Sequence, residues 1–309
     1  MKRIRSIAIV GAGAMGAAYA AMFSAACDFQ VYFVARGERY QKLSQGPITV
    51  NGKLWRIPVL HPDRVEHPAD LVLVALKHHH LPGALQDIKA VTGEDTAILS
   101  VMNGLDSETI IGSVCGMDRM VDAIAVGIDA VREGEMFTYA NPGKILFGNC
   151  RTGSRDPRLP MVREALERAS IPSDIPPDIR RTLWWKFMIN VGINQASAVL
   201  RAPYGIFQSS QDARDLMMML MTEVINLARV MSINLTEKDL EDWLTILSSL
   251  SPGGKTSMLQ DMEAGRKTEV DIFAGKMAAM GREHRVATPV NETILRIILA
   301  MESMHCQNQ

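Results

Sequence analysis

The sequence contains only four cysteines in 309 residues, Cys27, Cys115, Cys150 and Cys306. No two of them have the C-x-x-C spacing of a metal or redox motif. Scattered thiols of this kind suit a reducing compartment and provide no metal site. We therefore expect a cytoplasmic protein that binds no metal.

An excess of charge of either sign is also missing. Lysine and arginine number 33 against 34 for aspartate and glutamate, so the chain has no net field to attract nucleic acid or an anionic membrane. The most apolar window, residues 216–231, is interrupted by Glu223 and Arg229, which argues against a membrane span. The sequence predicts a soluble globular protein with neither kind of partner.

The first chemical signal is the segment of residues 6–20, SIAIVGAGAMGAAYA. A short apolar run precedes Gly11, Gly13 and Gly16, and a run of small helix-forming residues follows Ala14. This is a strand, a glycine-rich turn and a helix start with G-x-G-x-x-G spacing, which is typical of a dinucleotide-binding turn. We expect the pyrophosphate to bind at the helix N-terminus, along the turn formed by Gly11, Ala12, Gly13, Ala14, Met15 and Gly16.

The next predicted strand, residues 30–35, ends at Arg36. This is the position, about twenty residues beyond the glycines, where a side chain reads the ribose of the cofactor. An acidic residue there accepts hydrogen bonds from a free 2′-hydroxyl, whereas arginine offers a planar fork of donors to a 2′-phosphate. Arg36 therefore favours NADP over NAD, with Arg39 as an assisting cation.

Two further buried strands, LVLVAL and AILSVM, end at Lys77 and at Asn103. In a doubly wound sheet, ligands bind outside the carboxyl ends of the strands, so both side chains are candidates for the site. Lys77 is followed by His78, His79 and His80. Three consecutive residues cannot share one face of a helix or strand, so we interpret them as a loop near the cofactor rather than a metal site.

The length and the 47% apolar content suit two domains. Residues 48–59, ITVNGKLWRIPV, predict a hairpin that turns at Asn51-Gly52 and is inserted on the edge of the sheet. Strand-like patterns with intervening helices continue to a helix predicted over residues 160–169, and a proline-rich segment, residues 171–178, is interpreted as a linker. Beyond residue 180 only helical patterns occur. The prediction is an α/β protein with a Rossmann-type doubly wound sheet in residues 1–176 and an all-α domain in residues 177–309.

The first helix of the second domain carries Lys186, Asn190 and Asn194 at intervals of four residues. At about 100° per residue, the three side chains share one stripe on a helix that is otherwise rich in apolar residues. A buried lysine beside two amides is costly unless it faces a wet cleft or a partner, so we interpret this stripe as functional.

Residues 255–271, KTSMLQDMEAGRKTEVD, hold two more candidates. Ser257 with Gln260 has the spacing of a capping box, which by itself explains the serine without a substrate. Glu269 also has the position of a helix start, yet it supplies the carboxylate that Lys186 would otherwise lack.

Together these residues resemble the ketopantoate reductase (2-dehydropantoate 2-reductase) family along essentially the whole chain. The matching features are GAGAMG from Gly11, Arg36, Lys77, Asn103-Gly104, K-x-x-x-N-x-x-x-N from Lys186 and the TSMLQD-x-x-x-x-R-x-TE-x-D run from Thr256. The resemblance implies a Rossmann domain followed by a helical domain, and reduction of ketopantoate with NADPH on the way to pantothenate.

By the same resemblance, Lys186 would donate the proton to the ketone oxygen, and Glu269 would hold and tune it. Asn190, Asn194 and Ser257 would bind the substrate, while Lys77 and Asn103 would lie between the nicotinamide and the substrate. Many members carry asparagine where this chain has Tyr204, and an asparagine near Gly254, which leaves the choice of 2-oxo acid open.

The alternatives are a β-hydroxyacid dehydrogenase, which shares the K-x-x-x-N pattern, and a non-catalytic NADP sensor. The sequence leaves the oligomeric state open, a homodimer included.

Overall fold

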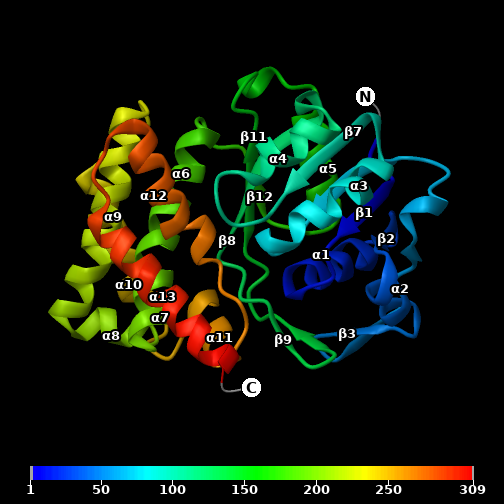
Figure 1. Ribbon diagram of the computed structural model, residues 1–309. Coiled ribbons are helices and arrows are strands. Elements are labelled where there is room, and N and C mark those ends of the chain that lie inside the picture. Colours follow the sequence, from blue (N-terminus) through cyan, green and yellow to red (C-terminus); the bar gives the residue numbers. More distant parts are fainter. Residues whose placement is uncertain (1–2, 308–309) are drawn as a thin grey trace. The chain divides into compact units, whose positions relative to one another are not determined.

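The computed structural model describes residues 3–307. The chain divides into two compact units, Met1–Ile179 (unit 1) and Arg180–Gln309 (unit 2). Figure 1 shows that unit 1 mixes strands and helices, whereas unit 2 is built from helices. The mixed α/β fold with a helical C-terminal part therefore agrees with the sequence-based prediction.

The main sheet of unit 1 has the strand order β12-β11-β8-β7-β6-β1-β2-β5. Its strands are β1 (Ser6–Val10), β2 (Gln30–Val34), β5 (Val59–Leu60), β6 (Ala69–Val74), β7 (Thr92–Ser100), β8 (Met120–Val126), β11 (Lys144–Gly148) and β12 (Ser173–Asp174). Only the β8–β11 pair is antiparallel. The chain leaves β1 toward β2 on one side and later returns to β6 on its other side, so the order reverses at β1. Such a switch point is where an open parallel sheet binds its ligand.

Helices cover both faces of this sheet because the strands are apolar on both faces. Ile7, Ile9 and Leu71 pack with residues of α1 (Ala14–Ala25) and α5 (Arg158–Arg168). The alternate residues Ala8 and Val72 pack with residues of α3 (Leu81–Ala90) and α4 (Ser107–Cys115) on the other face. The period-two alternation of the strands thus produces two cores, one on each face of the sheet.

A second, four-stranded sheet was not predicted. It has the order β4-β3-β10-β9, from β3 (Ile48–Val50), β4 (Lys53–Trp55), β9 (Val131–Glu133) and β10 (Met136–Thr138). The hairpin at Asn51 and Gly52 is confirmed, with φ of 48° and 75° at the two turn residues. Its expected place on the edge of the main sheet is wrong, because β3 pairs instead with β10 in the second sheet. The short α2 (Gly37–Ser44) precedes this hairpin.

The interpretation of residues 171–178 as a plain linker is also wrong. Ser173 and Asp174 form β12, which pairs in parallel with β11 at the edge of the main sheet. Unit 1 continues to Ile179, against which Gly148 packs so closely that a Cβ there would lie 2.9 Å from the Ile179 Cβ. The proline-rich segment therefore contains an edge strand of the sheet.

Unit 2 contains helices from α6 onward. They are α6 (Ile179–Ile189), α7 (Gln195–Leu200), α8 (Tyr204–Ser209), α9 (Gln211–Val230), α10 (Glu237–Ser249), α11 (Ser257–Glu263), α12 (Ala274–His284) and α13 (Pro289–Gln307). Between α6 and α7 lies a π-helical segment, Asn190–Asn194, and a 3₁₀ turn, Val270–Ile272, precedes α12.

A buried polar network ties four of these helices together. The Glu223 carboxylate accepts hydrogen bonds from the backbone N–H groups of Val290 and Asn291 at 2.8 and 3.0 Å, at the N-terminus of α13. The Asn291 side chain donates to Glu223 at 2.8 Å and contacts Gln195 at 3.1 Å. Gln195 in turn accepts from the N–H of Ala274 at 2.9 Å. The charge of Glu223 is thus matched by a helix N-terminus, and the network fixes α7, α9, α12 and α13 around the end of the π-helical segment.

Candidate functional site

The three glycines of the turn formed by residues 11–16 (the glycine turn) have different environments. Gly11 has φ of 110°, and a Cβ there would lie 2.5 Å from the Ala75 carbonyl oxygen. At Gly16, a Cβ would overlap the carbonyl oxygen of Gly11. A Cβ at Gly13 would meet no atom within 4 Å. The packing of the protein therefore requires glycine at positions 11 and 16, whereas the open space at Gly13 suits the approach of a ligand.

The start of α1 is also prepared for an anion. Gly13 is the N-cap residue, so no side chain caps the helix, and its first turn holds no acidic residue. The free N–H groups of Ala14, Met15 and Gly16 and the helix dipole favour negative charge at this point. A pyrophosphate fits both observations. Arg39 donates from Nη2 to the carbonyl oxygen of Ala12, so this arginine supports the turn from α2.

Arg36 lies at the N-cap of α2, directly after β2 and Ala35. Its guanidinium contacts the Asp87 carboxylate on α3, with Nε at 2.6 Å and Nη2 at 2.5 Å from Oδ1. Asp63 lies farther away, 3.8 Å from Nη2. The hydrogen bond and charge of Asp87 raise the pKa of Arg36, whose side chain is 48% exposed and so accessible from solvent. The pairing with Asp87 was not expected from the sequence.

Lys77 and Asn103 follow two neighbouring parallel strands. Val74 at the end of β6 is paired with Ser100 at the end of β7, and each polar residue comes three positions later, so both lie at the same carboxyl edge of the sheet. Both are partly buried. The structure therefore brings Lys77 and Asn103 to the edge at which the glycine turn follows β1.

A buried hydroxyl and carboxyl group lie beside the segment that carries Asn103. Ser100 Oγ contacts Ser107 Oγ at 2.8 Å, and Ser107 Oγ donates to Glu108 Oε2 at 2.9 Å. Burial raises the pKa of Glu108 to about 7. The hydrogen bond between Ser100 and Ser107 thus joins the two ends of the segment formed by residues 101–106. Asp106 is the N-cap residue of α4 and makes no side-chain capping bond.

The three histidines form a 3₁₀ turn, His78–His80, between Lys77 and α3. The rings of His79 and His80 lie 4.1 Å apart, and His78 Nε2 is buried without a hydrogen bond. No group of three potential metal ligands occurs among residues 3–307.

In unit 2, Lys186, Asn190 and Asn194 (the polar stripe) follow one another across the end of α6. The structure departs from a uniform α-helix here, because residues 190–194 are π-helical. The wider π turn keeps the two amides together, and Asn194 Nδ2 donates to Asn190 Oδ1 at 3.4 Å. Both are buried, with 3% and 7% of their surface exposed. Single π turns inside α-helices are frequent at functional sites.

The Lys186 ammonium has an unusual environment. Loss of hydration through burial lowers the pKa of Lys186 to about 8, and no carboxylate contributes to that shift. Glu269 belongs to the same unit and is 4% exposed. A lysine with a pKa near 8 can exist in both protonation states near neutral pH, as a proton donor requires.

Ser257 does not cap α11, so the capping-box interpretation is wrong. Thr256 is the N-cap, and its Oγ1 accepts from the N–H of Leu259 at 3.2 Å. Thr256 has extended backbone and is buried at 2% exposure, whereas Ser257 is the first helical residue and is exposed. The Ser257 hydroxyl has no hydrogen-bond partner within the described part of the chain. Its helix contacts the π-helical segment, which places Ser257 on an element adjacent to the polar stripe.

Tyr204 and Gly254, the two departures from the family pattern, are in contact. The Tyr204 N–H donates to the Gly254 carbonyl at 2.9 Å. A Cβ at Gly254 would lie 2.9 Å from Cδ2 of the Tyr204 ring. The tyrosine ring therefore requires a glycine beside it, and the two residues form one packing unit.

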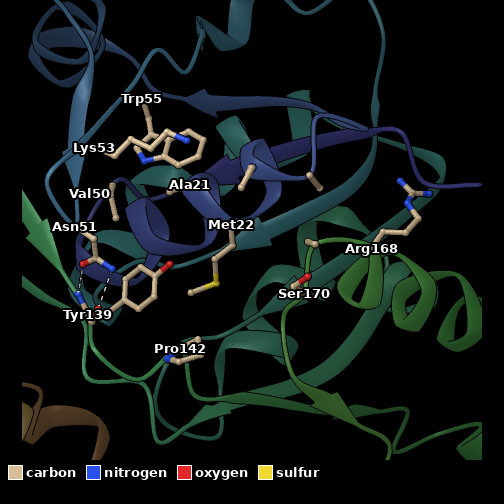
Figure 2. Close-up of a pocket in the computed structure, with 13 residues that line it drawn as sticks. Ala21, Met22, Val50, Asn51, Lys53, Trp55, Tyr139, Pro142, Arg168 and Ser170 are labelled. Atoms are coloured by element: carbon tan, nitrogen blue, oxygen red, sulfur yellow. Dashed lines mark hydrogen bonds between the residues drawn. The ribbon is translucent and has the colours of Figure 1, made fainter.

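A pocket of about 510 Å³ lies at the C-terminal end of α1, the opposite end from the glycine turn (Figure 2). Met22, Trp55 and Tyr139 line it, and Lys53 lies 4.2 Å from the Trp55 ring centre. None of the sequence-predicted site residues belongs to it. Within residues 3–307, every helix is too short or too polar to cross a bilayer.

The doubly wound sheet, the uncapped glycine turn and the polar side chains at the strand ends are typical of a nicotinamide-dependent oxidoreductase. Family models agree: "Ketopantoate reductase PanE/ApbA" matches residues 7–152, and "Ketopantoate reductase PanE/ApbA C terminal" matches residues 178–302. The chain belongs to the ketopantoate reductase family.

Relatives cover nearly the full chain. A 2-dehydropantoate 2-reductase of Archaeoglobus fulgidus is 26% identical over 97% of this chain and 99% of its own length. One of Aquifex aeolicus is 24% identical over 95% and 96%.

Solved structures share the fold. A 2-dehydropantoate 2-reductase from Geobacter metallireducens superposes with a TM-score of 0.85 at 25% identity, over 96% of this chain and 99% of that one. A D-mandelate dehydrogenase with NADH and anilino(oxo)acetate has a TM-score of 0.88 at 22% identity, over 97% and 99%. A dimeric ketopantoate reductase from Staphylococcus aureus has a TM-score of 0.80 at 21% identity, over 97% and 99%.

Proposed function

We propose that this protein reduces ketopantoate to pantoate with NADPH, as a step of pantothenate biosynthesis. The observation that carries the proposal is the polar stripe, in which a lysine with a lowered pKa precedes two buried, hydrogen-bonded amides on the same helical segment. A sensor that only bound NADP would gain nothing from a desolvated lysine on its second unit. The proposal also includes a cytoplasmic location and a homodimer, the assembly named for the Staphylococcus aureus relative.

The dinucleotide would be held by unit 1. The glycine turn and the start of α1 would bind the pyrophosphate, and Arg36 would bind a 2′-phosphate. Lys77 and Asn103, at the carboxyl edge of β6 and β7, would contact the nicotinamide half and, for Asn103, the substrate. When bound, the cofactor supplies a hydride to the ketone carbon of the substrate.

Lys186 would be the catalytic residue of unit 2. Hydride transfer leaves negative charge on the substrate's ketone oxygen, which a positioned ammonium stabilises and then protonates from Nζ. Glu269 would hold and tune Lys186. Asn190, Asn194 and Ser257 would orient the carboxylate and hydroxyl groups of the substrate, a role for which the free Ser257 hydroxyl is suited.

The choice of cofactor has its own test. Replacement of Arg36 by alanine should reduce the preference for NADPH over NADH about 10- to 100-fold, because a charge-assisted hydrogen bond to the 2′-phosphate is lost. Dissociation constants from nicotinamide fluorescence would show this directly. If the Arg36→Ala variant kept the full preference for NADPH over NADH, a group other than Arg36 would bind the 2′-phosphate.

A second candidate substrate is a 2-oxo acid without the terminal hydroxyl. The contact between Tyr204 and Gly254 favours it, because a ring there removes volume and two amide positions that the family often has. The phenol hydroxyl still offers one donor and one acceptor, so we favour ketopantoate.

NADPH oxidation should be measured with ketopantoate, with 3-methyl-2-oxobutanoate, which lacks only the hydroxymethyl group, and with other 2-oxo acids. Ketopantoate should have the higher kcat/KM by about 5- to 100-fold, since a missing hydroxyl leaves buried polar groups unpaired. Equal or faster reduction of the simpler acid would reject ketopantoate. Oxidation of 3-hydroxyisobutyrate instead would indicate a β-hydroxyacid dehydrogenase.

A further inference from the structure

Within the described part of the chain, Asp87 supplies the one carboxylate that is hydrogen-bonded to Arg36. It lies on α3, with 6% of its surface exposed, and both Nε and Nη2 of Arg36 point to its Oδ1. Burial of a carboxylate is costly unless the charge is paired. Among residues 3–307, Arg36 is the only side chain that pairs with Asp87, so the pair is what makes this buried charge tolerable.

The pair also changes what Arg36 can offer to a ligand. A guanidinium has five N–H donors in a rigid fork, and Asp87 occupies the edge formed by Nε and Nη2. The remaining donors keep a defined direction because that edge is fixed. The negative charge of Asp87, with Asp63 at 3.8 Å from Nη2, offsets the positive charge that a 2′-phosphate would meet.

We propose that Asp87 is a positioning residue that sets the cofactor specificity by holding Arg36 and competing with the 2′-phosphate for its charge. The preference for NADPH over NADH is then smaller than an arginine without a carboxylate partner would give, so the protein also binds NADH. This inference rests on the proposed function, in which Arg36 reads the dinucleotide.

The alternative is that Asp87 only anchors α3 to the end of β2. In that case its replacement changes stability and leaves the discrimination between phosphorylated and unphosphorylated ribose unchanged. The ratio of the affinities for ligands with and without a 2′-phosphate therefore distinguishes the two roles, whereas enzyme activity does not.

The test uses the full chain and isothermal titration calorimetry with 2′,5′-ADP and 5′-AMP, which differ at the 2′-phosphate. Asp87→Asn removes the charge and keeps an acceptor for Nε. It should raise the affinity ratio of 2′,5′-ADP to 5′-AMP about 3- to 10-fold, with the gain in 2′,5′-ADP binding. The NADPH to NADH ratio should rise in parallel. An unchanged or lower ratio would overturn the proposal.

Asp63→Asn is the matched control. This carboxylate is 71% exposed and farther from Arg36, so its removal should change the ratio less than about 2-fold. An effect as large as that of Asp87→Asn would show that general surface charge, and not the bonded pair, sets the preference. If Asp87→Asn proves too unstable by its melting temperature, Asp87→Ser supplies the same neutral change with a smaller side chain.

A double-mutant cycle tests the route through Arg36. In the Arg36→Ala background, Asp87→Asn should no longer raise the ratio, because there is no guanidinium left to release. If Asp87→Asn still raised the affinity ratio fully in the Arg36→Ala background, Asp87 would act by direct repulsion of the 2′-phosphate. That result would overturn its role as a positioning residue. The proposed function and this inference fail in different ways. If the native chain bound none of the nucleotides, the proposed function would be refuted, and the inference with it. If the native chain did not reduce ketopantoate but the variants showed the expected affinity ratios, only the substrate would be refuted.

Discussion

The glycine turn of unit 1 and the polar stripe of unit 2 are two candidate binding regions that the sequence specifies in different ways. In the glycine turn, two of the three glycines are required by the protein's own packing, and only Gly13 faces open space. In the polar stripe, packing alone would favour apolar residues at all three positions, so the lysine and the amides impose a cost on the fold. A motif dictated by backbone geometry indicates a fold with a binding site. A costly polar motif indicates chemistry.

The largest effect is expected at the polar stripe. Lys186→Ala should lower kcat for ketopantoate reduction about 10²- to 10⁴-fold, because the proton donor is lost, while the dissociation constant of NADPH changes less than about 2-fold. Steady-state kinetics and nicotinamide fluorescence measure the two quantities.

Lys238→Ala is the control for Lys186→Ala. Lys238 is in the same unit but is 74% exposed and paired with Asp242, so activity should be retained. A Lys186→Ala enzyme that lost NADPH binding but turned over normally at saturation would place Lys186 in the cofactor site instead.

The next effect concerns the stability of unit 2. Glu223→Ala should lower the free energy of unfolding by about 2–4 kcal/mol, because the N–H groups of Val290 and Asn291 and the Asn291 amide lose a charged acceptor. Glu223→Gln keeps an acceptor and should lose less. Chemical denaturation measures both. Equal stability of all three proteins would show that the network contributes specificity rather than stability.

Within the glycine turn, the comparison can be sharpened by single methyl groups. Gly13→Ala should leave the melting temperature nearly unchanged yet weaken NADPH binding about 10-fold or more, because its Cβ occupies space that the pyrophosphate needs. Gly16→Ala should destabilise the fold by about 1–3 kcal/mol, through overlap with the Gly11 carbonyl. Thermal melts with and without NADPH separate the two. If Gly13→Ala strongly destabilised the fold, Gly13 would also be required by the protein's own packing, and the distinction between Gly13 and Gly16 would be lost.

Much of the fold could be predicted because its signals are local. The strand and turn before α1 and the Asn51-Gly52 hairpin each depend on residues adjacent in sequence. The second sheet could not be predicted, since β3 pairs with β10, about ninety residues later, and short strands at such separation leave no local pattern. β12 was missed because two residues with flanking prolines look like a linker.

The candidate site was predictable in its residue types but not in its pairings. Four-residue spacing is compatible with either an α- or a π-helix, so the wider turn at residues 190–194 could not be read from it. Thr256 and Ser257 are both capable caps, and only the position at which the helix begins, Ser257, shows that Thr256 is the cap. Asp87 looks like a surface residue of α3, and its bond to Arg36 spans 51 positions.

The central claim is that Lys186 supplies the proton, and the pH dependence of kcat/KM tests it most directly. Burial lowers the pKa of Lys186 to about 8, and the donor is active only when protonated. Ketopantoate reduction should therefore be constant below about pH 8 and fall about tenfold per pH unit above it, while pantoate oxidation, which needs the neutral amine, should rise through the same pH. A reduction rate that stays flat from pH 7 to about pH 10 would contradict the account.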